Sequence, residues 1–147
     1  MARGLISQDT RLYWNVDAHV GPGCPNKVDD VQLVQFGYWC MGNNPKTPIS
    51  AADRALFAAI VPGAPYSGLA SDALTIAIKR HQQIRGGTQD GKVSPMQANQ
   101  GYNWIITALS NNMSNYLPSM WPQIDKHTKC PPALKAAILK CFAPHPG

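Results

Sequence analysis

The chain contains no glutamate, so all eight of its acidic side chains are aspartates. Enzymes that cleave glycosidic bonds usually pair two carboxylates, and the acid of the pair is very often a glutamate. The only adjacent aspartates, Asp29 and Asp30, lie where we expect a helix cap. The sequence therefore disfavours a muramidase or a lytic transglycosylase.

Long apolar segments are also missing. No run comes near the ~20 apolar residues that a membrane-crossing helix needs, so we expect no membrane span. The first ten residues, MARGLISQDT, hold one arginine and a very short apolar patch, which does not fit a secretory signal peptide. We therefore expect a cytoplasmic protein, or one that reaches the cell envelope by a route that needs no such signal.

The four cysteines lack the two-residue spacing of a zinc knuckle, so we expect no metal site and no cofactor. Cys130 and Cys141 bracket a predicted helix, whose rise separates them by roughly 16 Å, too far for one disulfide. A second predicted helix limits pairing of Cys24 with Cys40 in a similar way. Two alternatives remain: free thiols, or disulfides that join the two halves of the chain.

The residues that are present favour one soluble domain with many loops. The chain has 147 residues, of which 44% are hydrophobic, 13 are proline and 12 are glycine. Its formal net charge of +5 favours acidic partners, among which wall polymers with carboxylates or phosphates qualify alongside nucleic acid. Because no basic ribbon interleaved with aromatics is present, we expect no nucleic-acid partner.

Residues 71–95, SDALTIAIKRHQQIRGGTQDGKVSP, carry the clearest local pattern. Ser71 or Asp72 can cap a helix. The helix should end at a glycine pair, because glycine adopts the left-handed conformation at little cost. Its inward face should then be formed by residues at three- and four-residue steps, namely Ala73, Leu74, Ala77, Ile78, His81 and Gln82.

The second half of this stretch predicts a corner between two helices. Asp90 followed by Gly91 is a tight-turn signal, and Ser94 followed by Pro95 predicts the start of another helix. Elsewhere, alternation and periodicity predict an extended arm over residues 10–20. They also predict helices over residues 29–41, 50–60, 95–116 and 132–141, the last with Leu134, Ala137, Ile138 and Cys141 facing inward.

Within residues 71–95, the pattern A(I/V)xxxQ followed by xDGxVxP resembles the repeat of the peptidoglycan-binding-like domains. These are small three-helix modules found beside bacterial cell-wall hydrolases. The earlier segment DDVQLVQ, residues 29–35, resembles the first helix of that family. The resemblance covers about residues 28–106, although the link over residues 42–68 is longer than is usual in the family.

This resemblance implies an all-α fold with a three-helix core, an N-terminal extended arm and an extra C-terminal helix. We expect a single domain over residues 1–147. Its helical core should span residues 28–117, its arm residues 1–27, and the extension over residues 118–147 should pack on the core.

The resemblance further implies a non-catalytic module that recognises wall glycan or stem peptide in a shallow groove. The edge after the predicted helix supplies Gln83, Asp90 and Lys92 as ligand-binding candidates, joined by Trp39 and Tyr66 as aromatic candidates. Four aromatics could stack on sugar rings, with burial in the core as the alternative for each: Trp39, Tyr66, Trp104 and Trp121.

A second hypothesis keeps the fold and changes the partner. The chain would then be a protein-interaction adaptor, or a cargo component of a contractile or type VI-like secretion system. The loops over residues 42–48 and 62–68 would make the contact.

A third hypothesis is a cysteine-dependent hydrolase of wall peptides. Cys130 precedes a predicted helix, whose dipole lowers the pKa of a thiol, and His127 is close in sequence. Cys24 is the other candidate nucleophile. The residues around Cys130 lack the glycine-rich neighbourhood of an oxyanion hole, and a structural role is the alternative.

Overall fold

A computed structural model describes residues 3–8, 11–97 and 104–142. The chain forms strands β1 (Arg3–Gln8) and β2 (Arg11–Asn15), then helices α1 (Val28–Asn43), α2 (Ala51–Ala58), α3 (Ala73–Ile84), α4 (Ile105–Tyr116) and α5 (Pro132–Phe142), with a short 3-10 turn at Ile124–Lys126. The predicted all-α class is confirmed, whereas the three-helix core of the family stays a prediction. In the described part, no helix combines the length and the apolar character needed to traverse a bilayer.

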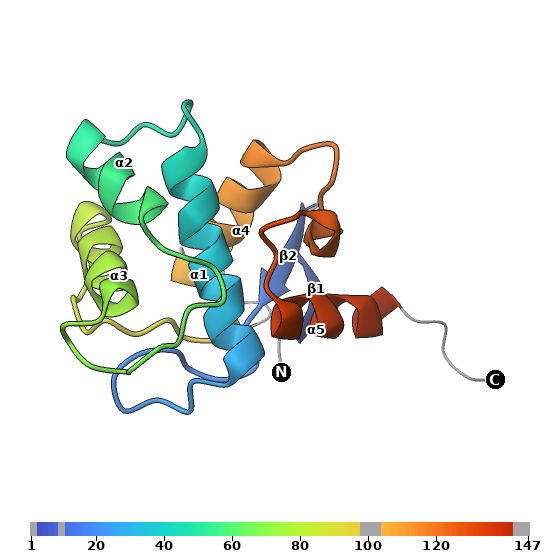
Figure 1. Cartoon of the computed structure of the whole chain (residues 1–147), viewed down its shortest axis with the longest axis horizontal. Helices are drawn as coiled ribbons and strands as arrows, with labels where there is room; N and C mark the ends of the chain where they lie inside the picture. Colours follow the sequence, from blue (N-terminus) through green and yellow to red (C-terminus); the bar gives the residue numbers. More distant parts are fainter. Residues whose placement is uncertain (1–2, 9–10, 98–103, 143–147) are drawn as a thin grey trace.

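Helix α1 forms the centre of the molecule. It stands between α2 and α3 on one side and α4 and α5 on the other (Figure 1). Leu33, Phe36 and Tyr38 have no exposed surface, because the helix is apolar on more than one side and each side meets another element. A Cβ on Gly42 would lie 2.1 Å from the backbone nitrogen of Ala58, so the missing side chain lets α2 approach α1 closely.

The N-terminal arm is part of the core. Strand β2 confirms the predicted extended segment and pairs antiparallel with β1. The side chain of Trp14 is 1% exposed, and its indole nitrogen donates to the carbonyl of Pro122 at 2.8 Å. The buried amide of Asn15 bonds both backbone groups of Met96, at 2.8 and 2.9 Å. These bonds join the arm to segments more than 80 residues away.

The short helices begin where the sequence predicts. Ser50 accepts a hydrogen bond from the backbone nitrogen of Asp53 at 3.1 Å and caps α2. Asp72 caps α3 by accepting from the nitrogen of Leu74 at 2.9 Å. Gly86, with φ of 73°, follows the end of α3 in the left-handed conformation.

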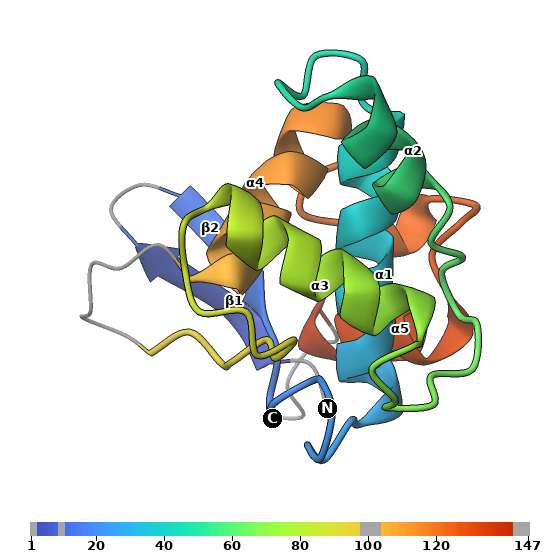
Figure 2. The same ribbon diagram turned by 90° about the vertical axis from the view of Figure 1, so that its left-hand side faces the viewer.

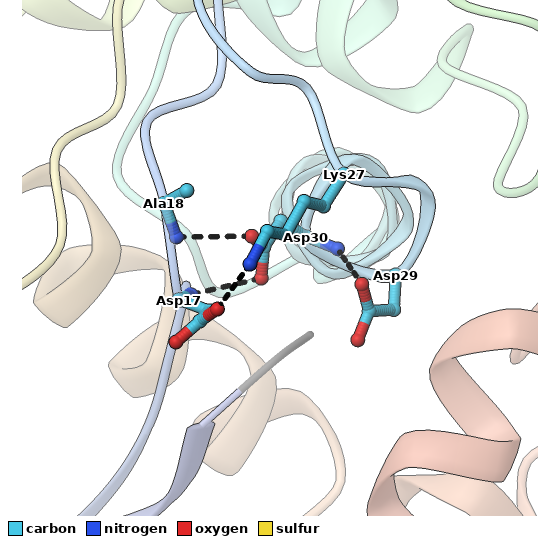
Figure 3. Close-up of polar contacts among 5 residues, drawn as sticks. All are labelled: Asp17, Ala18, Lys27, Asp29 and Asp30. Carbon is cyan, nitrogen blue, oxygen red and sulfur yellow. Dashed lines mark hydrogen bonds and ion pairs between the residues drawn. The ribbon is translucent and has the colours of Figure 1, made fainter.

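The predicted cap of the first helix is wrong. Lys27 occupies the cap position and makes no side-chain cap bond. The carboxylate of Asp30 is buried instead, and it accepts hydrogen bonds from the backbone nitrogens of Asp17 at 2.9 Å and Ala18 at 3.1 Å (Figure 3). Asp30 therefore joins the segment after β2 to the first turn of α1.

The helix predicted to start at Ser94 is also wrong. Residues 94–97 are not helical, and α4 begins at Ile105; residues 98–103 lie outside the described part. Val93 instead forms an antiparallel bridge with Val20, with N···O distances of 2.7 and 3.0 Å. This pairing, together with the Asn15 bonds, outweighs the local helix-start signal.

The inward face predicted for the last helix is partly wrong. Leu134, Ala137 and Ile138 are buried, but Cys141 is exposed. The last turn of α5 lies at the edge of the core, where Phe142 meets the ring of Trp14 and still exposes 43% of its surface.

Candidate binding site

The turn after α3 is held by one buried amide, that of Gln82. Its nitrogen donates to the carboxylate of Asp90 at 2.8 Å and to the carbonyl of Lys92 at 3.0 Å. Its oxygen accepts from the backbone nitrogen of Gly91 at 2.9 Å. Figure 2 shows the chain turning back along α3 after the helix ends. Gln82 is the glutamine of the A(I/V)xxxQ pattern, so the two halves of the motif bond to each other.

Two further contacts stabilise the turn, one within it and one with the segment at Gly21. Within the turn, Oδ1 of Asp90, which also accepts from Gln82, accepts a hydrogen bond from the backbone nitrogen of Lys92 at 3.0 Å. Gly91 has φ of 72°, which a side chain would strain. A Cβ on Gly21 would lie 2.5 Å from the carbonyl oxygen of Gly91, so the two glycines allow their segments to touch.

An open hollow of about 530 Å³ lies beside this turn. It brings together two cationic side chains, one carboxylate, two hydroxyl groups and the apolar start of α4. The lining residues are Gln82, Arg85, Gly87, Thr88, Asp90, Lys92, Ser94, Trp104 and Ile105. A volume of this size lies within the range of small-molecule sites, about 300–1,000 Å³.

The structure brings two of the five predicted ligand-binding residues to this hollow, Asp90 and Lys92. Gln83 does not line it. The oxygen of the Gln83 amide accepts a hydrogen bond from Arg80 at 2.8 Å. The guanidinium of Arg80 also donates to both carboxylate oxygens of Asp53, at 2.7 and 3.0 Å. That guanidinium holds the pKa of Asp53 below its usual value.

The predicted aromatics lie elsewhere. Trp39 is half-buried between the rings of Phe36, Tyr116 and His127, at centroid distances of 6.0, 6.0 and 5.4 Å. Tyr66 shares a hydrogen bond of 2.6 Å with the hydroxyl of Thr75 and lines a separate hollow of about 190 Å³. Neither ring lines the hollow that holds Asp90 and Lys92.

Sequence reasoning missed Gln82 and Arg85 as lining residues and named Trp104 only as one aromatic among four. A signal was present for Gln82, because a glutamine on the inward face of an amphipathic helix needs buried partners. For Trp104 no local signal exists, because its place depends on how α4 packs against α1 and β2, which are distant in the sequence.

The candidate nucleophiles show no activated thiol. Burial raises the pKa of Cys130 to about 12, and burial also raises that of Cys24. Nδ1 of His127 accepts from the backbone nitrogen of Lys129 at 3.0 Å. The dipole expected to lower the pKa of Cys130 is therefore outweighed by desolvation. Of the two alternatives for the cysteines, the structure has the free thiols.

His81 lies in the core, as predicted. It shares a hydrogen bond of 3.0 Å with the hydroxyl of Tyr38, and burial lowers its pKa to about 4. The imidazole is therefore neutral at physiological pH. Among residues 3–8, 11–97 and 104–142, no three side chains of the metal-ligating kinds gather into a group.

No protein-family model, curated protein or solved structure matches this chain. Function is therefore inferred from the hollow beside Gln82 and from the motif that builds it.

Proposed function

We propose that this chain is a non-catalytic binding module that recognises bacterial cell-wall material, either its glycan or its stem peptide. One observation supports this most directly. The glutamine and the Asp-Gly pair of the resembling motif bond to each other, and the turn that they form lines the open hollow. The motif thus stabilises the turn that forms one wall of the open hollow.

The chemistry of the lining supports binding without bond cleavage. Within the described part of the chain, neither a cysteine nor a histidine lines the hollow. Gln82 uses both ends of its amide to hold the turn, and one oxygen of Asp90 accepts two hydrogen bonds. These groups are committed to structure, which leaves the outward charges of the hollow to contact a ligand.

The experiment is co-sedimentation with purified wall sacculi at low salt. We expect the protein to sediment with them and to dissociate as salt rises, because exposed charges are screened beyond ~10 Å at 0.1 M salt. The double variant Asp90→Asn, Lys92→Gln should be retained less well. Lys135→Ala, which removes an exposed charge on α5, is the matched control. No retention of the unmodified protein at low salt would overturn the proposal.

A specific observation supports the adaptor hypothesis as a second candidate. Val61 and Leu69, on either side of the loop over residues 62–68, are 64% and 62% exposed, and nearby Val28 is 65% exposed. A small hollow lined by Val28, Val31 and Tyr66 lies next to the same loop. Loop 42–48, the other predicted contact, is fastened by Arg54, whose guanidinium donates to the carbonyls of Asn44 and Thr47.

Co-purification with the product of a neighbouring gene tests this candidate. We expect Val61→Asp with Leu69→Asp to abolish capture if the apolar loop is the contact. Capture that survives this change and is lost in Asp90→Asn, Lys92→Gln would assign the contact to the charged hollow instead.

A further inference from the structure

We infer that the hollow beside Gln82 takes a zwitterionic peptide group, which presents an ammonium and a carboxylate close together, and not a neutral glycan. The inference rests on the proposed function, and within wall material it selects the stem peptide. Diamino acids in stem peptides carry both charges on one residue. A peptide with free termini shares that chemistry, so the experiment separates the two sources.

The first argument is that opposite charges line the hollow without neutralising each other. Lys92 and Asp90 are two residues apart and both exposed. Their side chains form no ion pair with each other, and in the described part of the chain the Lys92 ammonium has no other carboxylate partner. The bonds from Gln82 and from the Lys92 backbone fix the turn that separates them.

The second argument concerns which atoms remain for a ligand. One oxygen of Asp90 accepts from Gln82 and Lys92, which leaves the second oxygen without a hydrogen-bond partner among the described residues. Ammonium groups donate to such an oxygen. The ammonium of Lys92, which lines the same hollow, suits a carboxylate of the ligand. One site thus offers complementary groups of both signs.

The third argument excludes glycan as the preferred ligand. Stacking on sugar rings needs open aromatic faces, and among the described residues that line the hollow the one aromatic is Trp104, which is half-buried beside Ile105. Trp39 and Tyr66 are engaged elsewhere. The apolar surface of Trp104 and Ile105 suits the aliphatic part of a side chain or a methyl group. The hydroxyls of Thr88 and Ser94 suit peptide amides.

Isothermal titration of the full chain with synthetic ligands tests the inference. The main ligand is a stem tetrapeptide that contains diaminopimelate. Its comparison ligands are the same peptide with the free amine of diaminopimelate acetylated, the same peptide with its carboxylates amidated, dialanine, and a neutral N-acetylglucosamine tetramer. We expect the intact peptide to bind, and each blocked peptide to bind about three- to fivefold more weakly, the usual loss for an exposed charge pair.

The variants assign each charge to its partner. Lys92→Gln should lower the affinity for the intact peptide about three- to fivefold and leave the affinity for the amidated peptide unchanged. Asp90→Asn keeps the oxygen that bonds Gln82. It should lower the affinity for the intact peptide and leave the affinity for the acetylated peptide unchanged. Lys135→Ala is the control and should change neither. Equal losses for intact and blocked peptides would overturn the assignment.

The outcomes separate this inference from the proposed function. Retention on sacculi with no binding of the tetrapeptide, or with tighter binding of the glycan, overturns the inference and leaves wall binding in place. Binding of the tetrapeptide without retention on sacculi overturns the proposed function and supports the zwitterionic site. Equal affinity for dialanine overturns the stem peptide as the source and assigns the site to peptide termini in general.

Discussion

The side-chain oxygen of Gln82 accepts a hydrogen bond from the backbone nitrogen of Gly91 at 2.9 Å, while the nitrogen of the same amide bonds Asp90 and Lys92. Two halves of a sequence motif are therefore in direct contact. The shape of the hollow depends on this single buried amide, which makes it the best place to perturb the site without touching a charge.

Gln82→Ala should loosen the turn and reduce retention on sacculi. It leaves the backbone groups of Gly91 and Lys92 without their partner, at a cost to the free energy of unfolding of about 1–3 kcal/mol. Denaturant unfolding measures that cost, and hydrogen exchange at Gly91 measures the loosening. The neighbouring Gln83→Ala is the control, because Gln83 is exposed and its side chain accepts a hydrogen bond from Arg80 instead of holding the turn. Gln83→Ala should change neither the free energy of unfolding nor the retention on sacculi as much as Gln82→Ala does. Equal decreases in the two variants would contradict a turn held by Gln82.

The buried histidine predicts how stability depends on pH. The folded pKa of His81 is about 4 against 6.5 when exposed, so the unfolded chain binds the extra proton between these values. Stability should therefore fall as pH drops from 6.5 towards 4, by up to about 3 kcal/mol. Unfolding curves across this range should show the fall in the unmodified chain and a smaller one in His81→Gln. Equal pH dependence of the two proteins would refute a neutral, buried imidazole.

The carboxylate of Asp30 gives a third prediction. Burial raises the pKa of Asp30, and the two backbone donors of residues 17 and 18 partly offset that effect. Asp30→Ala removes both acceptors, so we expect a loss of about 2–4 kcal/mol in the free energy of unfolding. Asp29→Ala, on the same turn of α1, is the matched control, with an expected loss below about 1 kcal/mol. A similar small loss for both variants would show that the arm is not fastened by Asp30.

The thiols should react in an order set by exposure and pKa. Cys141 is exposed, Cys24 and Cys130 are half-buried, and Cys40 is buried with a raised pKa. Alkylation under native conditions, followed by mass spectrometry, should label Cys141 first and Cys40 last. Labelling of all four sites without reductant is expected from free thiols. Early labelling of Cys130 would instead support the hydrolase hypothesis, and protection of one cysteine pair until reductant is added would indicate a disulfide.

Local signals in the sequence were sufficient for the features that local contacts determine. The caps at Ser50 and Asp72 bond residues two or three positions away, and the glycine after α3 needs only its own backbone conformation. The turn at Asp90 and Gly91 was predicted for the same reason. Likewise, periodicity predicted a helix over residues 29–41, and α1 covers that range.

Long-range contacts explain the errors. The bridge between Val20 and Val93 prevents the helix that Ser94 would otherwise start, and no pattern near Ser94 reveals it. Asp30 fits a cap by spacing, but its partners lie on the segment after β2. The hollow itself combines the end of α3 with the start of α4, so Trp104 could not be joined to Lys92 from sequence.

The central claim is that wall fragments bind in the hollow formed by the Gln82 turn. The most direct test is to record amide and indole chemical shifts of the labelled chain while soluble stem-peptide fragments are added. We predict saturable shifts at Gly87, Gly91 and Lys92 and at the indole of Trp104. Shifts confined to the loop over residues 62–68, or no shifts at millimolar ligand, would contradict the claim.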